Sequence, residues 1–143
     1  MIEGGCHCGR VALRITGPVH SFVHCHCQTC RKLHGTTFGS SALVTSEGFS
    51  VVKGSEHLTV YSSSLMKRRY FCSICGSHLF AVEERQGCRQ IILRIGTLAP
   101  GHGLLPEGHI FVEDKADWYC IRDDLPQHVG NPGASAPASV DEP

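Results

Sequence analysis

Apolar and polar residues alternate along most of the chain with the period of a β-strand. In residues 10–16 (RVALRIT), Val11, Leu13 and Ile15 fall on one face of an extended segment. Gly, Ser and Pro lie at short intervals along the chain and divide it into short runs of this kind. Short strands at close spacing favour small antiparallel sheets over alternating strands and helices. Further short runs rich in β-branched and aromatic residues lie at 49–54, 57–61, 68–71, 78–84, 89–96 and 109–114.

One stretch has the features of a helix. Residues 27–34 (CQTCRKLH) carry basic side chains in what would be the last turn. Gly35 follows directly, and glycine suits the residue that ends a helix. The sequence therefore predicts a mainly β protein with one short helix after its second cysteine cluster.

The length of 143 residues is that of a single domain. The stretch 130–143 (GNPGASAPASVDEP) has no apolar periodicity and is rich in Pro, Gly, Ala and Ser. Such a composition does not offset the entropy lost on ordering. We therefore expect one folded domain over residues 1–129 and a disordered tail over residues 130–143.

Charge and hydropathy exclude several classes of partner. Thirteen Lys and Arg residues balance thirteen Asp and Glu residues, so the chain has no electrostatic footprint for nucleic acid. No apolar run approaches the roughly 18 residues of a membrane span, and the first residues lack the pattern of a secretory signal. These features predict no nucleic-acid partner, no membrane partner and a cytoplasmic location, with the oligomeric state left open.

The chain has nine cysteines, and their odd number argues against a complete set of disulfides. A reducing compartment would also disfavour disulfides, so metal binding is the better interpretation. In C-x-C an extended backbone places both side chains on one face, and in C-x-x-C-G the chain turns tightly around a metal. Seven of the nine fall into three such groups: Cys6 and Cys8; Cys25, Cys27 and Cys30; Cys72 and Cys75.

Spacing allows these seven thiols to divide in more than one way. The simplest division closes a four-cysteine site from the first and third groups and leaves the middle group with an open fourth position. Alternatively, Cys25 and Cys27 join the third group, or a histidine completes the middle group. The nearest histidines are His24, His26 and His34. Cys88 and Cys120 have no ligand-spaced neighbour and are expected to be buried as small apolar residues.

Five motifs occur in order along the chain: GCHCGRV, CHCQTCRKLHG, RYFCSICGSHLF, LPEGHIFVEDKADW and DDLP. Together they resemble the glutathione-dependent formaldehyde-activating enzyme family, which also includes centromere protein V. The resemblance implies a β-tent fold and settles the division of the thiols. It implies that Cys6, Cys8, Cys72 and Cys75 hold a structural zinc. It also implies that Cys25, Cys27 and Cys30 hold a catalytic zinc. We expect two zinc ions per chain, with partial occupancy of the second site.

The implied activity is that of a carbon–sulfur lyase, which condenses glutathione with formaldehyde to S-(hydroxymethyl)glutathione, a step of formaldehyde detoxification. A zinc ion with three thiolate ligands suits a soft thiol as its fourth ligand. The expected partner is therefore a small thiol such as glutathione. The alternative is a zinc-stabilised module without catalysis, which binds a partner or carries thiols and electrophiles.

Other polar residues are candidates for support of the middle group. Gln28 and Thr29 are expected to donate hydrogen bonds to thiolates, and Arg31 to pair with a carboxylate. Arg69 is expected on a strand surface or at an anion. Histidines and one aromatic residue are interpreted chiefly as structural: His34 as a helix cap, His78 and His109 as hydrogen-bonded core residues, and Trp118 as a core aromatic.

Overall fold

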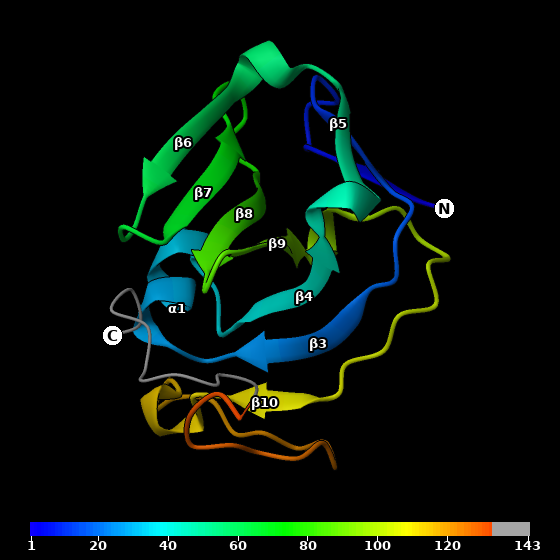
Figure 1. Ribbon diagram of the computed structural model, residues 1–143. Coiled ribbons are helices and arrows are strands. Elements are labelled where there is room, and N and C mark those ends of the chain that lie inside the picture. The colour runs from blue at the N-terminus through cyan, green and yellow to red at the C-terminus, as the bar shows by residue number, and fades with distance from the viewer. Residues whose placement is uncertain (133–143) are drawn as a thin grey trace. The chain divides into compact units, whose positions relative to one another are not determined.

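A computed structural model gives the structure of the protein and describes residues 1–132. The predicted tail therefore lies outside the described residues, apart from 130–132. Figure 1 shows a mainly β chain with one α-helix among the described residues, α1 (Gln28–His34). The strands are β1 (Ile2–Gly5), β2 (Ala12–Ile15), β3 (His20–Cys25), β4 (Gly39–Thr45), β5 (Phe49–Lys53), β6 (Leu58–Ser62), β7 (Lys67–Cys72), β8 (His78–Arg85), β9 (Cys88–Arg94) and β10 (Gly108–Ile110). Four single turns of 3₁₀-helix lie at Ser46–Gly48, Ser55–His57, Ile95–Thr97 and Val112–Asp114.

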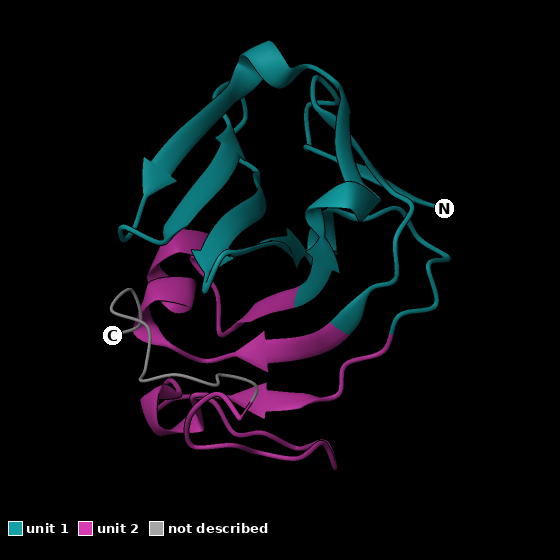
Figure 2. Ribbon diagram, in the orientation of Figure 1, with its two compact units in different colours: residues 1–20, 42–104 teal, residues 21–41, 105–143 magenta. Residues whose placement is uncertain are grey.

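The chain forms two compact units, which Figure 2 shows in teal and magenta. Unit 1 comprises Met1–His20 and Ala42–Leu104, and unit 2 comprises Ser21–Ser41 and Leu105–Pro143. Each cysteine cluster belongs to a single unit. The four-cysteine cluster lies in unit 1 and the three-cysteine cluster lies in unit 2.

Unit 1 contains a three-stranded antiparallel sheet in the order β1-β2-β5. The alternation in residues 10–16 behaves as predicted, because Val11, Leu13 and Ile15 are each only 1% exposed. Ile15 pairs with Ile2 on one side and with Phe49 on the other. Burial of this one face is what fixes the register of β2 in the sheet.

Unit 1 also contains an antiparallel meander of β6, β7, β8 and β9. Residues 79–82 of β8 are all buried, so this central strand is covered on both faces. Phe80 stacks on Tyr70 with ring centroids 4.7 Å apart, and Phe49 also contacts the ring of Phe80. The strands predicted at 57–61, 68–71, 78–84 and 89–96 correspond to these four elements.

Unit 2 departs from the antiparallel prediction. Strand β10 runs parallel to β3 and pairs Gly108 with Val23 and Ile110 with Cys25. The strand predicted over 109–114 is also too long. It ends at Ile110, because Phe111 takes a left-handed conformation at φ 54° and a turn of 3₁₀-helix follows.

Helix α1 begins and ends close to the predicted residues. Cys27 is its N-cap, and Gly35 ends it in the left-handed conformation at φ 56°. Arg31, Lys32 and His34 occupy the last turn, where a positive charge stabilises the helix dipole. No helix within residues 1–132 combines the length and apolar character needed to cross a membrane.

Three predictions of burial are wrong. Cys88 is exposed because it follows directly on the tight turn between β8 and β9, opposite Arg85. Cys120 is exposed in an irregular segment after β10. Trp118 is 70% exposed, and it lies in a turn closed by the backbone N–H of Tyr119, which donates to the carbonyl of Ala116 at 3.2 Å.

Candidate metal centres

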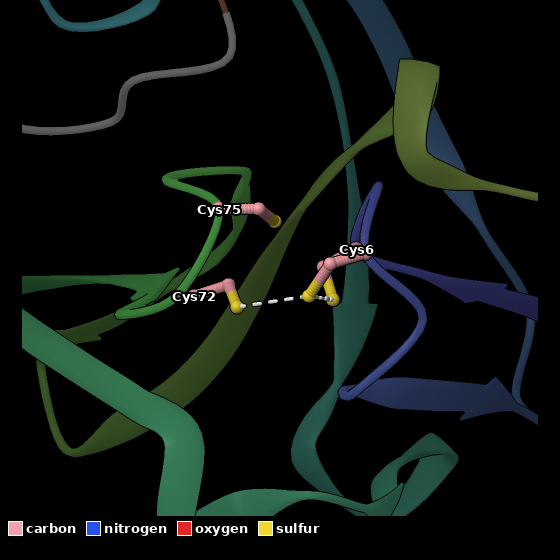
Figure 3. Close-up of side chains that lie close together, drawn as sticks. Cys6, Cys72 and Cys75 are labelled. Atoms are coloured by element: carbon pink, nitrogen blue, oxygen red, sulfur yellow. Dashed lines mark hydrogen bonds between the residues drawn. The ribbon is translucent and has the colours of Figure 1, made fainter.

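The first cluster joins two loops that are far apart in the sequence. Cys6 and Cys8 follow β1. Cys72 is the last residue of β7, and Cys75 lies in the turn after it. The four sulfur atoms all lie within 4.8 Å of one another. Figure 3 shows the side chains of Cys6, Cys72 and Cys75 pointing toward a common centre. Four sulfurs at this spacing match the ligand set of a closed structural zinc site.

The local sequence explains why each loop presents two sulfurs. Gly9 and Gly76, which directly follow the second cysteine of each pair, both have a φ of 80°. Each glycine closes its turn by donating its backbone N–H to the first cysteine's carbonyl, from Gly9 to Cys6 at 3.1 Å and from Gly76 to Cys72 at 2.8 Å. Only glycine takes this conformation without strain.

Polar groups around the first cluster favour the thiolate form of Cys75 and Cys8. Hydrogen bonds from the side chain and backbone of Ser77 lower the pKa of Cys75 to about 5. The backbone and side chain of Arg10 lower the pKa of Cys8. The backbone N–H of Val11 also donates to Sγ of Cys6 at 3.2 Å. Since the thiolate is the form that binds metal, these contacts suit a cation at the centre.

The second cluster is built around the start of α1. Cys25 ends β3, Cys27 caps the helix, and Cys30 lies in its first turn and donates its N–H to Sγ of Cys27 at 3.3 Å. Their three sulfur atoms also lie within 4.8 Å of one another. No other His, Cys, Asp or Glu of residues 1–132 completes this group to four.

The second cluster is more buried than the first. Cys25, Cys27 and Cys30 are 5%, 0% and 5% exposed and pack against Ile110. The pKa of Cys27 is raised, because Cys25 and Cys30 share hydrogen bonds with its thiol and because it is buried. Three thiolates this close are stable together only when a cation compensates their charge. The donor set therefore fits a soft divalent cation such as zinc.

Three histidines gather beside the second cluster within unit 2. Nε2 of His26 lies 2.8 Å from Nδ1 of His109, and Nε2 of His109 lies 3.0 Å from a carboxylate oxygen of Asp123. His24 contacts the ring of His109 and lies 2.8 Å from Oγ of Ser40. Burial, followed by the nearby His109, lowers the pKa of His26 to about 4, so its imidazole is neutral at pH 7.

The other polar residues that the sequence singled out differ in how far they are exposed. Gln28 is exposed, while Thr29, Arg31 and His34 are partly exposed on α1. Arg69 does not lie on a strand surface, since it is 2% exposed and donates from Nε to Oγ of Ser63. His109 is fully buried and hydrogen-bonded, as expected.

Sequence reasoning missed three residues of these centres. Ser77, Phe38 and Asp123 received no role, although Ser77 and Asp123 lie within the motifs CGSHL and DDLP. Phe38 contacts the rings of both His24 and His26. No local pattern marks Phe38, whereas the other two could have been found from their place in these motifs.

The family model for the glutathione-dependent formaldehyde-activating enzyme matches residues 1–114. The chain belongs to this family. A protein of Halomonas elongata named "Putative glutathione-dependent formaldehyde-activating enzyme" is 32% identical over 127 residues, which cover 82% of this chain and 79% of that protein. A protein of Sordaria macrospora with the same name is 30% identical over 72% of this chain, and the match spans only 46% of its own length.

A solved structure supports the fold. The crystal structure of a Rhodobacter sphaeroides protein superposes with a TM-score of 0.57 and 24% sequence identity. The match covers 73% of this chain and 91% of that one. Together with the family model, this likeness confirms the resemblance noted from the cysteine motifs.

Proposed function

We propose that this member of the family is a zinc-dependent carbon–sulfur lyase that condenses glutathione, or a related thiol, with formaldehyde or another small electrophile. The observation that carries the proposal is the buried group of Cys25, Cys27 and Cys30, which lacks a fourth protein ligand among the described residues. A site with three protein ligands keeps a position for substrate, whereas a site with four is closed.

The three thiols determine what this site can hold. As thiolates they carry one more negative charge than a divalent cation carries positive charge, so the set favours a soft sulfur ligand over activation of water. When bound, zinc supplies a Lewis-acid centre at which a substrate thiolate is held. Burial of the three side chains keeps bulk water away from their sulfurs.

The reaction itself needs no redox partner. The S–H bond of the thiol breaks, a C–S bond forms to the carbonyl carbon, and the proton ends on the former carbonyl oxygen as the hemithioacetal hydroxyl. Since thiols add to formaldehyde without an enzyme, the protein contributes mainly by positioning the two reactants. The proposal includes a cytoplasmic location, where glutathione is the main small thiol.

The first cluster has a different role in this proposal. Cys6, Cys8, Cys72 and Cys75 hold a structural zinc that ties the loop after β1 to the loop after β7 in unit 1. Both loops are short, at residues 6–11 and 73–77, and a structural metal contributes directly to the stability of the segments that it joins.

The test is an exchange measurement by NMR on the full chain with two zinc ions bound. The rate of interconversion between formaldehyde plus glutathione and S-(hydroxymethyl)glutathione is measured with and without protein. We expect wild-type protein to raise this rate and Cys27→Ser to return it to the uncatalysed value. Cys88→Ser, which removes an exposed thiol outside both clusters, is the matched control and should behave as wild type.

An uncatalysed rate with the zinc-loaded wild-type protein would reject the enzyme. The alternative, a zinc-stabilised module that binds a partner or carries thiols, would then account for the same two clusters. Binding of glutathione without turnover would favour the carrier form of that alternative.

A further inference from the structure

A continuous chain of hydrogen bonds runs from a surface carboxylate to the segment that carries the second cluster. Asp123 has a side chain that is 44% exposed, and both of its oxygens lie 3.0–3.1 Å from Nε2 of His109. Nδ1 of His109 lies 2.8 Å from Nε2 of His26. His26 stands between Cys25 and Cys27 in the sequence, and its imidazole is fully buried.

The direction of these bonds follows from the carboxylate. A carboxylate only accepts hydrogen bonds, so Nε2 of His109 carries the proton that points at Asp123. With neutral rings, Nδ1 of His109 is then an acceptor, and Nε2 of His26 donates to it. Asp123 therefore fixes the tautomer of His109, and His109 fixes both the tautomer and the orientation of His26.

His109 is itself held firmly. Its backbone N–H donates to the carbonyl of Pro126 at 2.8 Å, and its carbonyl accepts from His128 at 2.9 Å. On the other side, β10 pairs with β3, and His26 donates its backbone N–H to Ile110 at 3.0 Å. Since both its backbone and its ring are fixed, His109 offers a rigid reference point for the His26 ring.

We infer that His109 and Asp123 are positioning residues that hold His26, and through it the Cys25–Cys27 segment, in the conformation that binds metal. Cys25 ends β3 and the backbone of Cys27 is also extended, at φ −62° and ψ 153°. Side chains alternate along an extended backbone, so fixing the ring of His26 on one side of the segment fixes the two flanking thiols on the other. This inference rests on the proposed function in one respect, namely that the three thiols bind a metal. It adds residues that neither supply a ligand atom nor belong to the cysteine motifs.

Two substitutions of His109 separate positioning from packing. In His109→Asn the amide oxygen takes the place of Nδ1 and still accepts from His26, while the bond to Asp123 is lost. In His109→Gln the amide nitrogen takes the place of Nε2 and still donates to Asp123, while the bond to His26 is lost. Packing alone would not favour the shorter asparagine over glutamine.

The readout is the affinity of the second cluster for Co²⁺, followed by the cobalt–thiolate absorption, in the full chain with zinc kept in the four-cysteine site. Loss of a partner that orients a metal site typically weakens binding about 10- to 100-fold. We expect a loss of this size in His109→Gln and an affinity within about 3-fold of wild type in His109→Asn. Asp123→Ala, at an exposed position, should also weaken binding, whereas Asp124→Ala, its exposed neighbour, should not.

Equal affinities in His109→Asn and His109→Gln would overturn the inference, whether both match wild type or both are weakened alike. If either His109 variant fails to fold, an unchanged affinity in Asp123→Ala overturns it instead. Those outcomes leave the proposed function intact, because wild-type protein still binds cobalt at the three thiols. A wild-type protein that binds no cobalt there would overturn both.

Discussion

The sulfur atoms of Cys8 and Cys72 lie 3.8 Å apart, although 64 positions separate the two residues in the sequence. The contact joins the loop that follows β1 to the end of β7, within unit 1. The backbone N–H of His7 reinforces it by donating to Oγ of Ser77 at 3.0 Å. A metal bound here closes a long loop of the chain, which makes it a large contribution to stability.

Substitution of Cys72 should therefore damage the fold far more than substitution of Cys27. Structural zinc contributes about 10–16 kcal/mol of apparent binding free energy in small zinc-binding peptides, which is comparable to the whole stability of a domain. We expect Cys72→Ser to lose the cooperative thermal transition of unit 1. Cys27→Ser should keep that transition and lose one of two zinc ions by elemental analysis.

The control for this pair is Cys88→Ser, which should keep both zinc ions and the wild-type transition, because its thiol is exposed and outside both clusters. Equal unfolding in Cys72→Ser and Cys27→Ser would contradict the division into a structural and an open site.

Stability should fall as the pH drops below about 6.5. Burial lowers the pKa values of His24, His26 and His78, and for His26 to about 4. An unfolded histidine takes up its proton near pH 6.5, so between about pH 6.5 and 4 the unfolded chain binds more protons than the folded one. Above this window the titration of His26 does not change the free energy of unfolding. Inside the window the free energy of unfolding decreases as the pH falls.

Denaturant titrations at several pH values between 7 and 5 measure this slope. His26→Gln keeps a donor in place of Nε2 and cannot titrate, so its slope should be flatter than that of wild type. Identical slopes in the two proteins would contradict the burial of a neutral His26.

Trp118 should report an aqueous environment. It is the only tryptophan of the chain and is 70% exposed. We expect native fluorescence with an emission maximum close to that of free tryptophan and efficient quenching by acrylamide. Emission shifted to the blue and protected from acrylamide would restore the prediction of a core aromatic.

Much of unit 1 could be predicted from local pattern. The face formed by Val11, Leu13 and Ile15 alternates cleanly, and each residue is buried as the period requires. The C-x-x-C-G stretch that ends at Gly76 also turns as predicted, and Gly9 takes the same conformation after Cys8. In these segments one short stretch of sequence contains both the turn chemistry and the buried face.

Unit 2 was harder to predict, because its structure depends on distant pairings. In β3 the apolar Phe22 and Val23 are adjacent rather than alternating, so the segment shows no strand period. The parallel pairing of Cys25 with Ile110 leaves no local signal, and neither does the contact of His109 with Asp123. Strands β1 and β4 were also missed, since small and polar residues dominate both.

The cysteine clusters could be predicted in part from local pattern. Spacing identified all seven thiols but left several divisions open, because a ligand pair does not specify its distant partner. The structure brings Cys6 and Cys8 to Cys72 and Cys75, and it keeps Cys25, Cys27 and Cys30 apart as a group of three. Their roles as structural and catalytic sites remain predictions.

The most direct test of the central claim is ¹¹³Cd NMR of the full chain loaded with cadmium at both clusters. We predict two resonances, one typical of four thiolates and one typical of three thiolates with a lighter fourth ligand. Added glutathione should move only the second resonance, toward the position of the first. Two tetrathiolate resonances without glutathione, or a second resonance that glutathione does not move, would contradict an open thiol-binding site at Cys25, Cys27 and Cys30.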